Sequence, residues 1–311
     1  MLGRRAVSGS RMDYVATLIA GPSLEPGALA ATVANARDAL ASLGAEPGAP
    51  DVLHDDRAID LPFADADPDQ ADSALRRAIG NDPIDVIAQP TADRRKRLLL
   101  ADLESTIIGQ EMLDELAELV GLRDRIADIT ARAMNGELDF RAALIERVAL
   151  LKDLPEASLD EVAKRITLHG GAASLLATMR EAGAHCVLVS GGFTRFAEPV
   201  AATIGFHEIH ANVLELGAGK LTGTVREPVR DKDDKLRVLK ETAARLQVPL
   251  AATLSVGDGA NDLPMLLAAG LGVAYHAKPA VRTAARARLD YADLSGLLYA
   301  QGFRAAEIIT P

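Results

Sequence analysis

RLLLADLEST, at residues 97–106, is the stretch of this chain that decides its fold. A short continuous apolar run that ends in an acid is typical of a buried parallel strand, and this one delivers Asp102 at its carboxyl end. Three similar stretches follow: HCVLVSGG at 185–192, ATLSVGDGAND at 252–262 and LGVAYHA at 271–277. Helical periodicity accompanies them over 172–182, 194–204, 233–246 and 262–269. This alternation predicts a doubly wound α/β fold with a parallel sheet, in which ligands bind beyond the carboxyl ends of the strands.

The rest of the chain divides into further predicted parts. Residues 107–169 show helical patterns only, which predicts a helical cap inserted into a core formed by 97–106 and 170–311. Residues 13–90 alternate strand and helix patterns and predict a small α+β module with no polar constellation in it. The charged segment PTADRRKR, at 90–97, is the predicted boundary between this module and the core.

Composition limits the classes of function. The 311 residues carry 34 basic and 44 acidic side chains, and the net charge of −10 argues against binding to nucleic acid or to an acidic membrane. A single cysteine, Cys186, excludes an internal disulfide framework and a multi-cysteine zinc site, and it suits a reducing cytoplasm. No apolar stretch is long enough for a transmembrane helix. We expect residues 1–12 to be a disordered leader, with a true start at Met12 as the alternative. We also expect the protein to be cytoplasmic.

Acidic side chains follow two of the predicted strands. Asp102 and Glu104 share one side of an extended backbone, since side chains two positions apart in a strand lie on the same face. The loop GDGAND, at 257–262, adds Asp258 and Asp262. Neighbouring carboxylates repel unless a cation or a shared proton intervenes, and oxygen donors without His or Cys suit Mg²⁺ rather than zinc or iron. The pattern predicts a magnesium site at the carboxyl edge of the sheet.

Groups suited to a phosphate follow the other strands. Ser190, Gly191 and Gly192 place a hydroxyl and backbone N–H groups before a predicted helix, as an anion requires. Lys235 precedes an amphipathic run and adds positive charge, a task that Lys232 could share. Each feature alone is common in turns or on solvated helices. Together, in this order, they predict a phosphoryl-transfer site with a carboxylate nucleophile.

At these residues the chain resembles the haloacid dehalogenase superfamily and, within it, the phosphoserine phosphatases. The resemblance covers about residues 97–300, and it implies a haloacid dehalogenase-like core with an inserted helical cap. The matching segments are DLESTIIGQEMLDELAELVG (102–121), ITARAMNGELDFRAALIERVALLKDLP (129–155), VLVSGGFTRFAEPVA (187–201), NVLELGAGKLTG (212–223) and VGDGANDLPMLLAAGLGVAYHAKP (256–279).

The resemblance also implies roles for individual residues. Asp102 is then the nucleophile, which forms an aspartyl-phosphate. Mg²⁺ is then held by Asp102, by the backbone carbonyl of Glu104 and by Asp258. A further carboxylate, that of Asp262, lies close by. The residues that the resemblance places around the phosphate are Ser190, Gly191, Lys235 and Asn261.

The charged groups of phosphoserine indicate which residue types its binding pocket needs. Phosphoserine carries an ammonium and a carboxylate besides its phosphate, so its pocket needs an anion and a cation. By the resemblance, Glu111 takes the ammonium and Arg147 grips the carboxylate, where a bidentate fork gives strength and direction. Met134 and Phe140 match apolar cap residues that close over the substrate. Without the resemblance, these last two fit a helix-packing core, and the two charged residues fit an exposed helix surface.

One residue, Glu104, departs from the family pattern, which has an Asp at this position. By the resemblance, this carboxyl group protonates the departing serine oxygen and then activates the water that hydrolyses the aspartyl-phosphate. The extra methylene moves the acid by roughly an ångström, and general acid–base help is worth about 10²–10⁴-fold. We therefore expect a slower but active phosphatase, in which Glu104→Asp gives equal or higher activity.

These observations lead to an expected function. We expect a Mg²⁺-dependent phosphoserine phosphatase that releases L-serine, the last step of serine biosynthesis. The alternatives are a phosphatase of another small phosphorylated metabolite and, because of Glu104, a weakly active or silent sensor of amino acids or phosphoserine. The module at 13–90 loosely resembles ACT-like ligand-binding or dimerisation domains, which implies a homodimer through this module; a packing appendage is the alternative.

Overall fold

The structure, a computed structural model, describes residues 12–134 and 138–311. Of the predicted leader only Met12 is among them. None of the helices in these two ranges has the length and apolar character that crossing a membrane requires. The chain forms two compact units. Unit 1 is the chain up to Arg95 with Leu289–Ala292 and Gly296–Glu307. Unit 2 is Lys96–Arg288 with Asp293–Ser295 and Ile308–Pro311.

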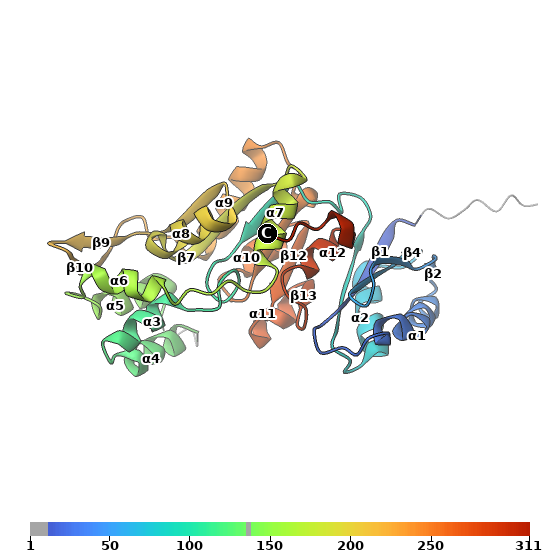
Figure 1. The fold of residues 1–311 in the computed structure, drawn as a ribbon, viewed down its shortest axis with the longest axis horizontal. Coiled ribbons are helices and arrows are strands. Elements are labelled where there is room, and N and C mark those ends of the chain that lie inside the picture. Colours follow the sequence, from blue (N-terminus) through green and yellow to red (C-terminus); the bar gives the residue numbers. More distant parts are fainter. Residues whose placement is uncertain (1–11, 135–137) are drawn as a thin grey trace, which may run out of the picture. The chain divides into compact units, whose positions relative to one another are not determined.

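Unit 1 contains an antiparallel sheet with the order β2-β4-β1-β5, and β3 also pairs with β4. Its elements are β1 (Tyr14–Ala20), α1 (Ala28–Ser42), β2 (Glu46–Pro47), β3 (Asp51–His54), β4 (Ala58–Ala64), α2 (Pro68–Ile79), β5 (Ile84–Pro90), α12 (Gly296–Ala300) and η2 (Ala305–Glu307). Leu18, Leu61 and Phe63 of the sheet are fully buried with Leu75 of α2. With β2 and β3 counted as one broken strand, β1 to β5 have the βαββαβ order of the ferredoxin-like folds (Figure 1).

The expectation that this module has no polar constellation is wrong. Asp60 accepts hydrogen bonds from the Thr17 hydroxyl at 2.9 Å and from the Arg94 guanidinium at 2.7 Å. Asp60 and Thr17 face each other across β4 and β1, whereas Arg94 comes from the segment after β5. The three residues are far apart in sequence, so no local pattern predicts their buried ion pair.

The end of the chain belongs in part to unit 1, although the sequence predicted a core that extended to residue 311. Asp85 of β5 is buried and accepts the backbone N–H groups of Asp290, Tyr291 and Ala292. Arg94 donates to the carbonyl of Ala300 at 2.8 Å, as does the Gln89 side chain at 2.7 Å. These side-chain-to-backbone bonds hold the segment in unit 1, and its own sequence gives no sign of them.

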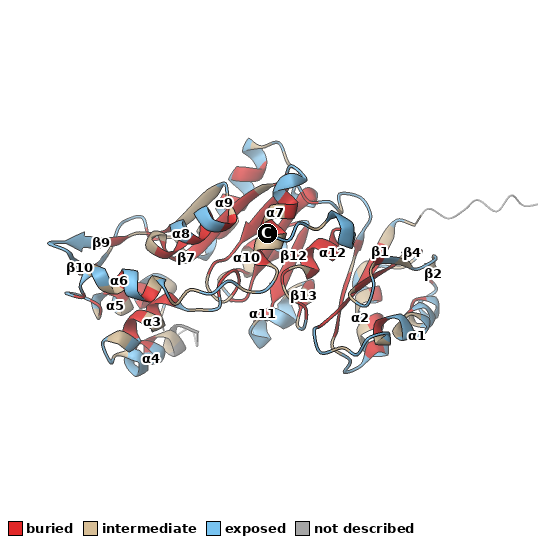
Figure 2. Ribbon diagram, in the orientation of Figure 1, coloured by how far each residue is buried: buried red, intermediate tan, exposed pale blue. Residues whose placement is uncertain are grey.

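Unit 2 contains the predicted parallel sheet: the strand order is β13-β12-β11-β6-β7-β8, and the pairings from β12 to β8 are all parallel. The strands are β6 (Leu98–Ala101), β7 (His185–Phe193), β8 (Glu208–Asn212), β11 (Thr253–Gly257), β12 (Leu271–Tyr275) and β13 (Ala287–Leu289). The other elements are α7 (Ala172–Glu181), α8 (Thr194–Ile204), α9 (Lys232–Arg245), η1 (Leu250–Ala252), α10 (Leu263–Ala268) and α11 (Pro279–Ala284). Every residue of β6 is fully buried, as expected for a continuous apolar strand at the centre of a sheet. Figure 2 shows the burial of the neighbouring strand β7.

The cap is helical, as predicted, and a β-hairpin adjoins it. Its helices are α3 (Met112–Leu119), α4 (Arg123–Met134), α5 (Phe140–Ala149) and α6 (Glu156–Ala163). The hairpin consists of β9 (Leu214–Gly217) and β10 (Lys220–Val225). It is hydrogen-bonded to the cap: the N–H of Asp153 donates to the carbonyl of Leu221, and the N–H of Leu221 donates to the carbonyl of Leu154. The sequence did not predict this hairpin, since its strands are short and separated by Ala218 and Gly219, both at positive φ.

Candidate active site

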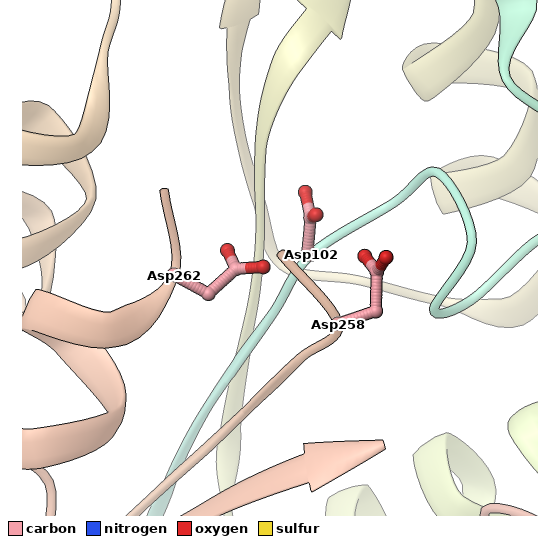
Figure 3. Close-up of side chains that lie close together, drawn as sticks. All are labelled: Asp102, Asp258 and Asp262. Carbon is pink, nitrogen blue, oxygen red and sulfur yellow. The ribbon is translucent and has the colours of Figure 1, made fainter. Parts of the chain in front are cut away.

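The three predicted metal-binding aspartates meet at the carboxyl edge of the unit 2 sheet. Asp102 directly follows β6 and Asp258 directly follows β11, whereas Asp262 immediately precedes α10. All three are buried, and one carboxylate oxygen of each lies within 4.8 Å of those of the others. In Figure 3, Asp102 stands between the other two. Among residues 12–134 and 138–311, these three aspartates form the cluster of side chains that could hold a metal ion.

Lys235 is the cation that contacts this group. Its Nζ lies 2.8 Å from Asp102 Oδ1 and 2.6 Å from Asp262 Oδ1. A capping box at Asp231 begins α9 and fixes the first helical turn, from which Lys235 extends. Lys232, at the same end of α9, is exposed. The sequence left open whether Lys232 shares the task of Lys235, and it is Lys235 whose ammonium contacts the aspartates.

Further contacts hold the acidic loop in place. Asp262 Oδ2 accepts the N–H of Gly259 at 3.0 Å. A Cβ at Gly257 would lie 2.3 Å from Asp262 Cγ, so only glycine fits there without moving that aspartate. Lys278 Nζ lies 3.8 Å from Asp258 Oδ2. Lys278 belongs to the AKP end of a segment that matches the family, but no sequence pattern singles it out.

Burial and mutual repulsion disfavour ionisation of these carboxyl groups. Loss of hydration, followed by the charge of Asp262, raises the pKa of Asp102 to about 8 against the opposing effect of Lys235. The same two causes raise the pKa of Asp258 to about 6. Burial lowers the pKa of Lys235, but the charges of Asp102 and Asp262 outweigh it and keep that pKa above the ordinary value. An added cation would favour the ionised carboxylates, and a donor set made of oxygens fits Mg²⁺.

The predicted phosphate-binding residues lie beside the acids. Ser190 and Gly191 stand near the carboxyl end of β7, and the Ser190 hydroxyl accepts the N–H of Gly192 at 2.9 Å. A Cβ at Gly191 would lie 3.1 Å from Cζ of Phe140 and 3.9 Å from Nδ2 of Asn261. The structure thus brings the SGG loop, the acidic loop and the first residue of α5 together.

Glu104 and Glu111 lie where the core passes into the cap. Glu104 Oε1 accepts the N–H of Met112, the first residue of α3, at 3.2 Å. The Ser105 hydroxyl donates to Glu111 Oε1 at 2.7 Å, and Ser105 has a φ of +54°. Loss of hydration, then the charges of Glu111 and Asp102, raises the pKa of Glu104 well above its ordinary value. No sequence pattern predicts the contacts of Ser105 and Met112, because both depend on the turn between strand and cap.

Arg147 lies on α5 of the cap, and its Nη1 is 3.4 Å from the Thr130 hydroxyl of α4. It is half-buried, which lowers the pKa of its guanidinium, while the charges of Glu104, Asp114 and Glu111 raise it. Its Nε donates to the carbonyl of Ala143 at 3.3 Å within α5. The charged pair that the sequence proposed for an amino acid therefore lies within electrostatic range of Glu104. The side chain of Met134, the remaining predicted cap residue, lies outside the described residues.

A family model of haloacid dehalogenase-like hydrolases matches residues 99–267, more than half of the chain. The chain belongs to this family. Among the relatives of this haloacid dehalogenase-like hydrolase is a phosphoserine phosphatase of Mycobacterium tuberculosis, 40% identical over 237 residues, which are 76% of this chain and 58% of that protein. A phosphoserine phosphatase of Lactococcus lactis is 43% identical over 203 residues, which are 65% of this chain and 94% of that protein.

A solved structure resembles almost the whole haloacid dehalogenase-like hydrolase. The unliganded crystal structure of a probable phosphoserine phosphatase from Vibrio cholerae has a TM-score of 0.73 and 31% identity, covering 96% of this chain and 88% of that one. This chain spans between 56% and 65% of the length of three of its relatives. The predicted family and the predicted α/β class are confirmed. The ACT-like character of unit 1 stays a prediction.

Proposed function

We propose that this chain is a Mg²⁺-dependent phosphoserine phosphatase that hydrolyses O-phospho-L-serine to L-serine and phosphate, the last step of serine biosynthesis. The observation that carries the proposal is that the charges of both Arg147 and Glu111 act on Glu104, which lies two residues from Asp102 and its buried partner Lys235. One site thereby offers a nucleophile with phosphate-binding groups, an anion for an ammonium and a cation for a carboxylate. The named relatives are phosphoserine phosphatases, which supports the same substrate.

Asp102, the backbone carbonyl of Glu104 and Asp258 would hold Mg²⁺, with Asp262 close by. The clustered carboxylate oxygens fit a hard cation, and their mutual repulsion supplies the driving force to bind one. When bound, the ion withdraws negative charge from the phosphate oxygens. Lys235 contributes a fixed positive charge beside Asp102.

In the first proposed step, a carboxylate oxygen of Asp102 attacks phosphorus in line with the serine oxygen. The new bond joins Asp102 to phosphorus while the bond from phosphorus to the serine oxygen breaks. The departing oxygen takes a proton from the Glu104 carboxyl group, whose pKa is raised by burial, which favours the protonated form. Ser190, the Gly191 backbone and Asn261 orient the phosphate by hydrogen bonds.

In the second proposed step, water attacks the phosphorus of the aspartyl-phosphate. Glu104, now a carboxylate, takes the proton of that water, so the group ends the cycle as it began. The bond between phosphorus and Asp102 breaks and the carboxylate is restored. Phe140 packs beside the phosphate loop, and closure of the cap helices would exclude bulk water from the intermediate.

We further propose that the chain works in the cytoplasm, and that unit 1 joins two copies as a homodimer. Its net charge and its single buried cysteine fit a reducing compartment. Within the described residues, β5 pairs with β1 alone, and an edge strand of this kind offers backbone groups to a second copy. Light scattering at several concentrations tests the dimer, and a monomer throughout would refute it.

A substrate panel tests the proposed activity. Phosphate release is measured from phosphoserine, phosphothreonine and a sugar phosphate, each with Mg²⁺ and with EDTA, and with Asp102→Asn as the control. The proposal predicts Mg²⁺-dependent release that favours phosphoserine and disappears in the variant. Preference for the sugar phosphate would indicate another small metabolite, and tight binding of phosphoserine without turnover would indicate a sensor.

A further inference from the structure

The Glu104 carboxyl group lies between the backbone N–H of Met112 and the backbone of Gly192, an arrangement that we call the Glu104 seat. On one side its Oε1 accepts the N–H of Met112, where α3 begins. That N–H is one of the unpaired donors at the start of a helix, and Glu111, the residue at the cap position, makes no side-chain cap bond of its own. The longer side chain of Glu104 thus supplies the acceptor that the first cap helix lacks.

On the other side, the Glu104 carboxylate lies against Gly192. A Cβ placed on Gly192 would lie 2.7 Å from Glu104 Oε1, 2.9 Å from its Cδ and 3.1 Å from its Oε2. These separations are shorter than van der Waals contact, so any larger residue at 192 would displace the carboxylate. Gly192 is not at positive φ, which means that alanine can adopt its backbone conformation.

We propose that Gly192 and the N–H of Met112 are the positioning groups that set the place of the Glu104 acid, and that this site is built for glutamate at position 104. The inference rests on the proposed function and adds the reason why a glutamate works where the family has aspartate. It reverses the expectation drawn from the sequence for Glu104→Asp. The shorter side chain would withdraw by about one bond length from Met112 and leave its N–H without this acceptor.

If the seat positions Glu104, a side chain at position 192 should lower the rate of the reaction without an equal loss of folding stability. The atoms that would collide with a Cβ at 192 are the free end of a flexible side chain, so Glu104 can move aside with little strain on the fold. The carboxyl group would then be displaced by about an ångström from the position in which it protonates the departing serine oxygen. Misplacement of that size costs up to about 10²-fold in rate.

A double-mutant cycle tests the seat. The four proteins are the wild type, Gly192→Ala, Glu104→Asp and the double variant, each full-length and assayed with phosphoserine and Mg²⁺. Gly192→Ala should lower kcat by about 100-fold with KM within about threefold, and Glu104→Asp should lower kcat by about tenfold. In the Glu104→Asp background the alanine should cost less than about threefold, because the shortened acid no longer reaches it. Gly48→Ala, whose Cβ would have no neighbour nearer than 3.4 Å, is the matched control.

The outcomes separate the seat from the activity itself. A loss from Gly192→Ala that is equal within about twofold in both backgrounds would show independent effects and overturn the seat. A Glu104→Asp variant as active as the wild type would overturn it as well. A fall in melting temperature of Gly192→Ala that parallels its loss of kcat would mean a general packing role. Failure of the proposed function is distinct, since the wild type itself would then release no phosphate from phosphoserine.

Discussion

Replacing Lys235 by methionine removes the one charge that both Asp102 and Asp262 contact, while keeping an unbranched stem of similar length. The Nζ lies 2.8 Å and 2.6 Å from these carboxylates, and the side chains are 2%, 8% and 0% exposed for lysine, Asp102 and Asp262. Water therefore cannot take over the role of the ammonium. The variant would leave three carboxylates within 4.8 Å of one another, with only the half-exposed Lys278, 3.8 Å from Asp258, as a neighbouring cation.

Removing one partner of a buried ion pair costs about 3–5 kcal/mol, so Lys235→Met should lose about that much free energy of unfolding in EDTA. Saturating Mg²⁺ should stabilise the variant more than the wild type, because the ion no longer shares the site with a lysine charge. Loss of one preorganised charge-stabilising group should lower kcat by about 10²–10³-fold.

Urea unfolding with and without Mg²⁺ measures the stabilities, and phosphate release measures kcat. Lys232→Met is the matched control, since Lys232 starts the same helix and is exposed. The control should differ from the wild type by less than about 0.5 kcal/mol. Equal losses in the two variants, or a Lys235→Met protein as stable as the wild type in EDTA, would refute the account of the acidic cluster.

Four further results are expected. Arg94→Met should cost unit 1 about 3–5 kcal/mol in urea unfolding, because Asp60 keeps a buried charge without its partner; an unchanged transition would contradict the role of this ion pair. Arg147→Lys should raise KM for phosphoserine about 10- to 100-fold and leave KM for phenyl phosphate within about threefold, whereas equal shifts would exclude a carboxylate-binding role. Burial raises the pKa of the Cys186 thiol to about 12, so iodoacetamide at pH 8 should label it only after unfolding, and labelling of the native protein would show that the thiol is accessible. EDTA should abolish phosphate release and Mg²⁺ should restore it; activity that persists in EDTA would oppose a metal-dependent reaction.

The sequence predicted that acidic residues meet at the carboxyl edge of the sheet, because this depends only on which residues follow the parallel strands. A continuous apolar strand such as Leu98–Ala101 is typical of a buried parallel sheet, and neighbouring parallel strands end at one edge. Asp102 and Asp258 each follow such a strand directly, so their proximity needed no further information. The helical cap was predictable for a similar reason, since its apolar residues repeat with the helical period.

The details that the sequence could not provide depend on contacts between distant segments. Whether Lys232 or Lys235 is buried depends on which face of α9 packs inward, and both stand in the same charged run. The ion pair joins Asp60 of β4 to Arg94 in the segment after β5, and the bonds of Arg94 to the end of the chain go to backbone carbonyls of that segment. The place of Glu104 depends on a turn and on the absence of a side chain at Gly192, and neither has a periodic signature.

The most direct measurement of the central claim is the detection of a phosphoryl group on Asp102. The protein would be mixed with phosphoserine and Mg²⁺, quenched in acid within one turnover and digested for mass spectrometry. We predict a phosphorylated peptide that contains Asp102, that forms before serine release reaches steady state and that is missing from Asp102→Asn. Steady turnover with no such adduct, or an adduct on a different residue, would contradict attack by this carboxylate.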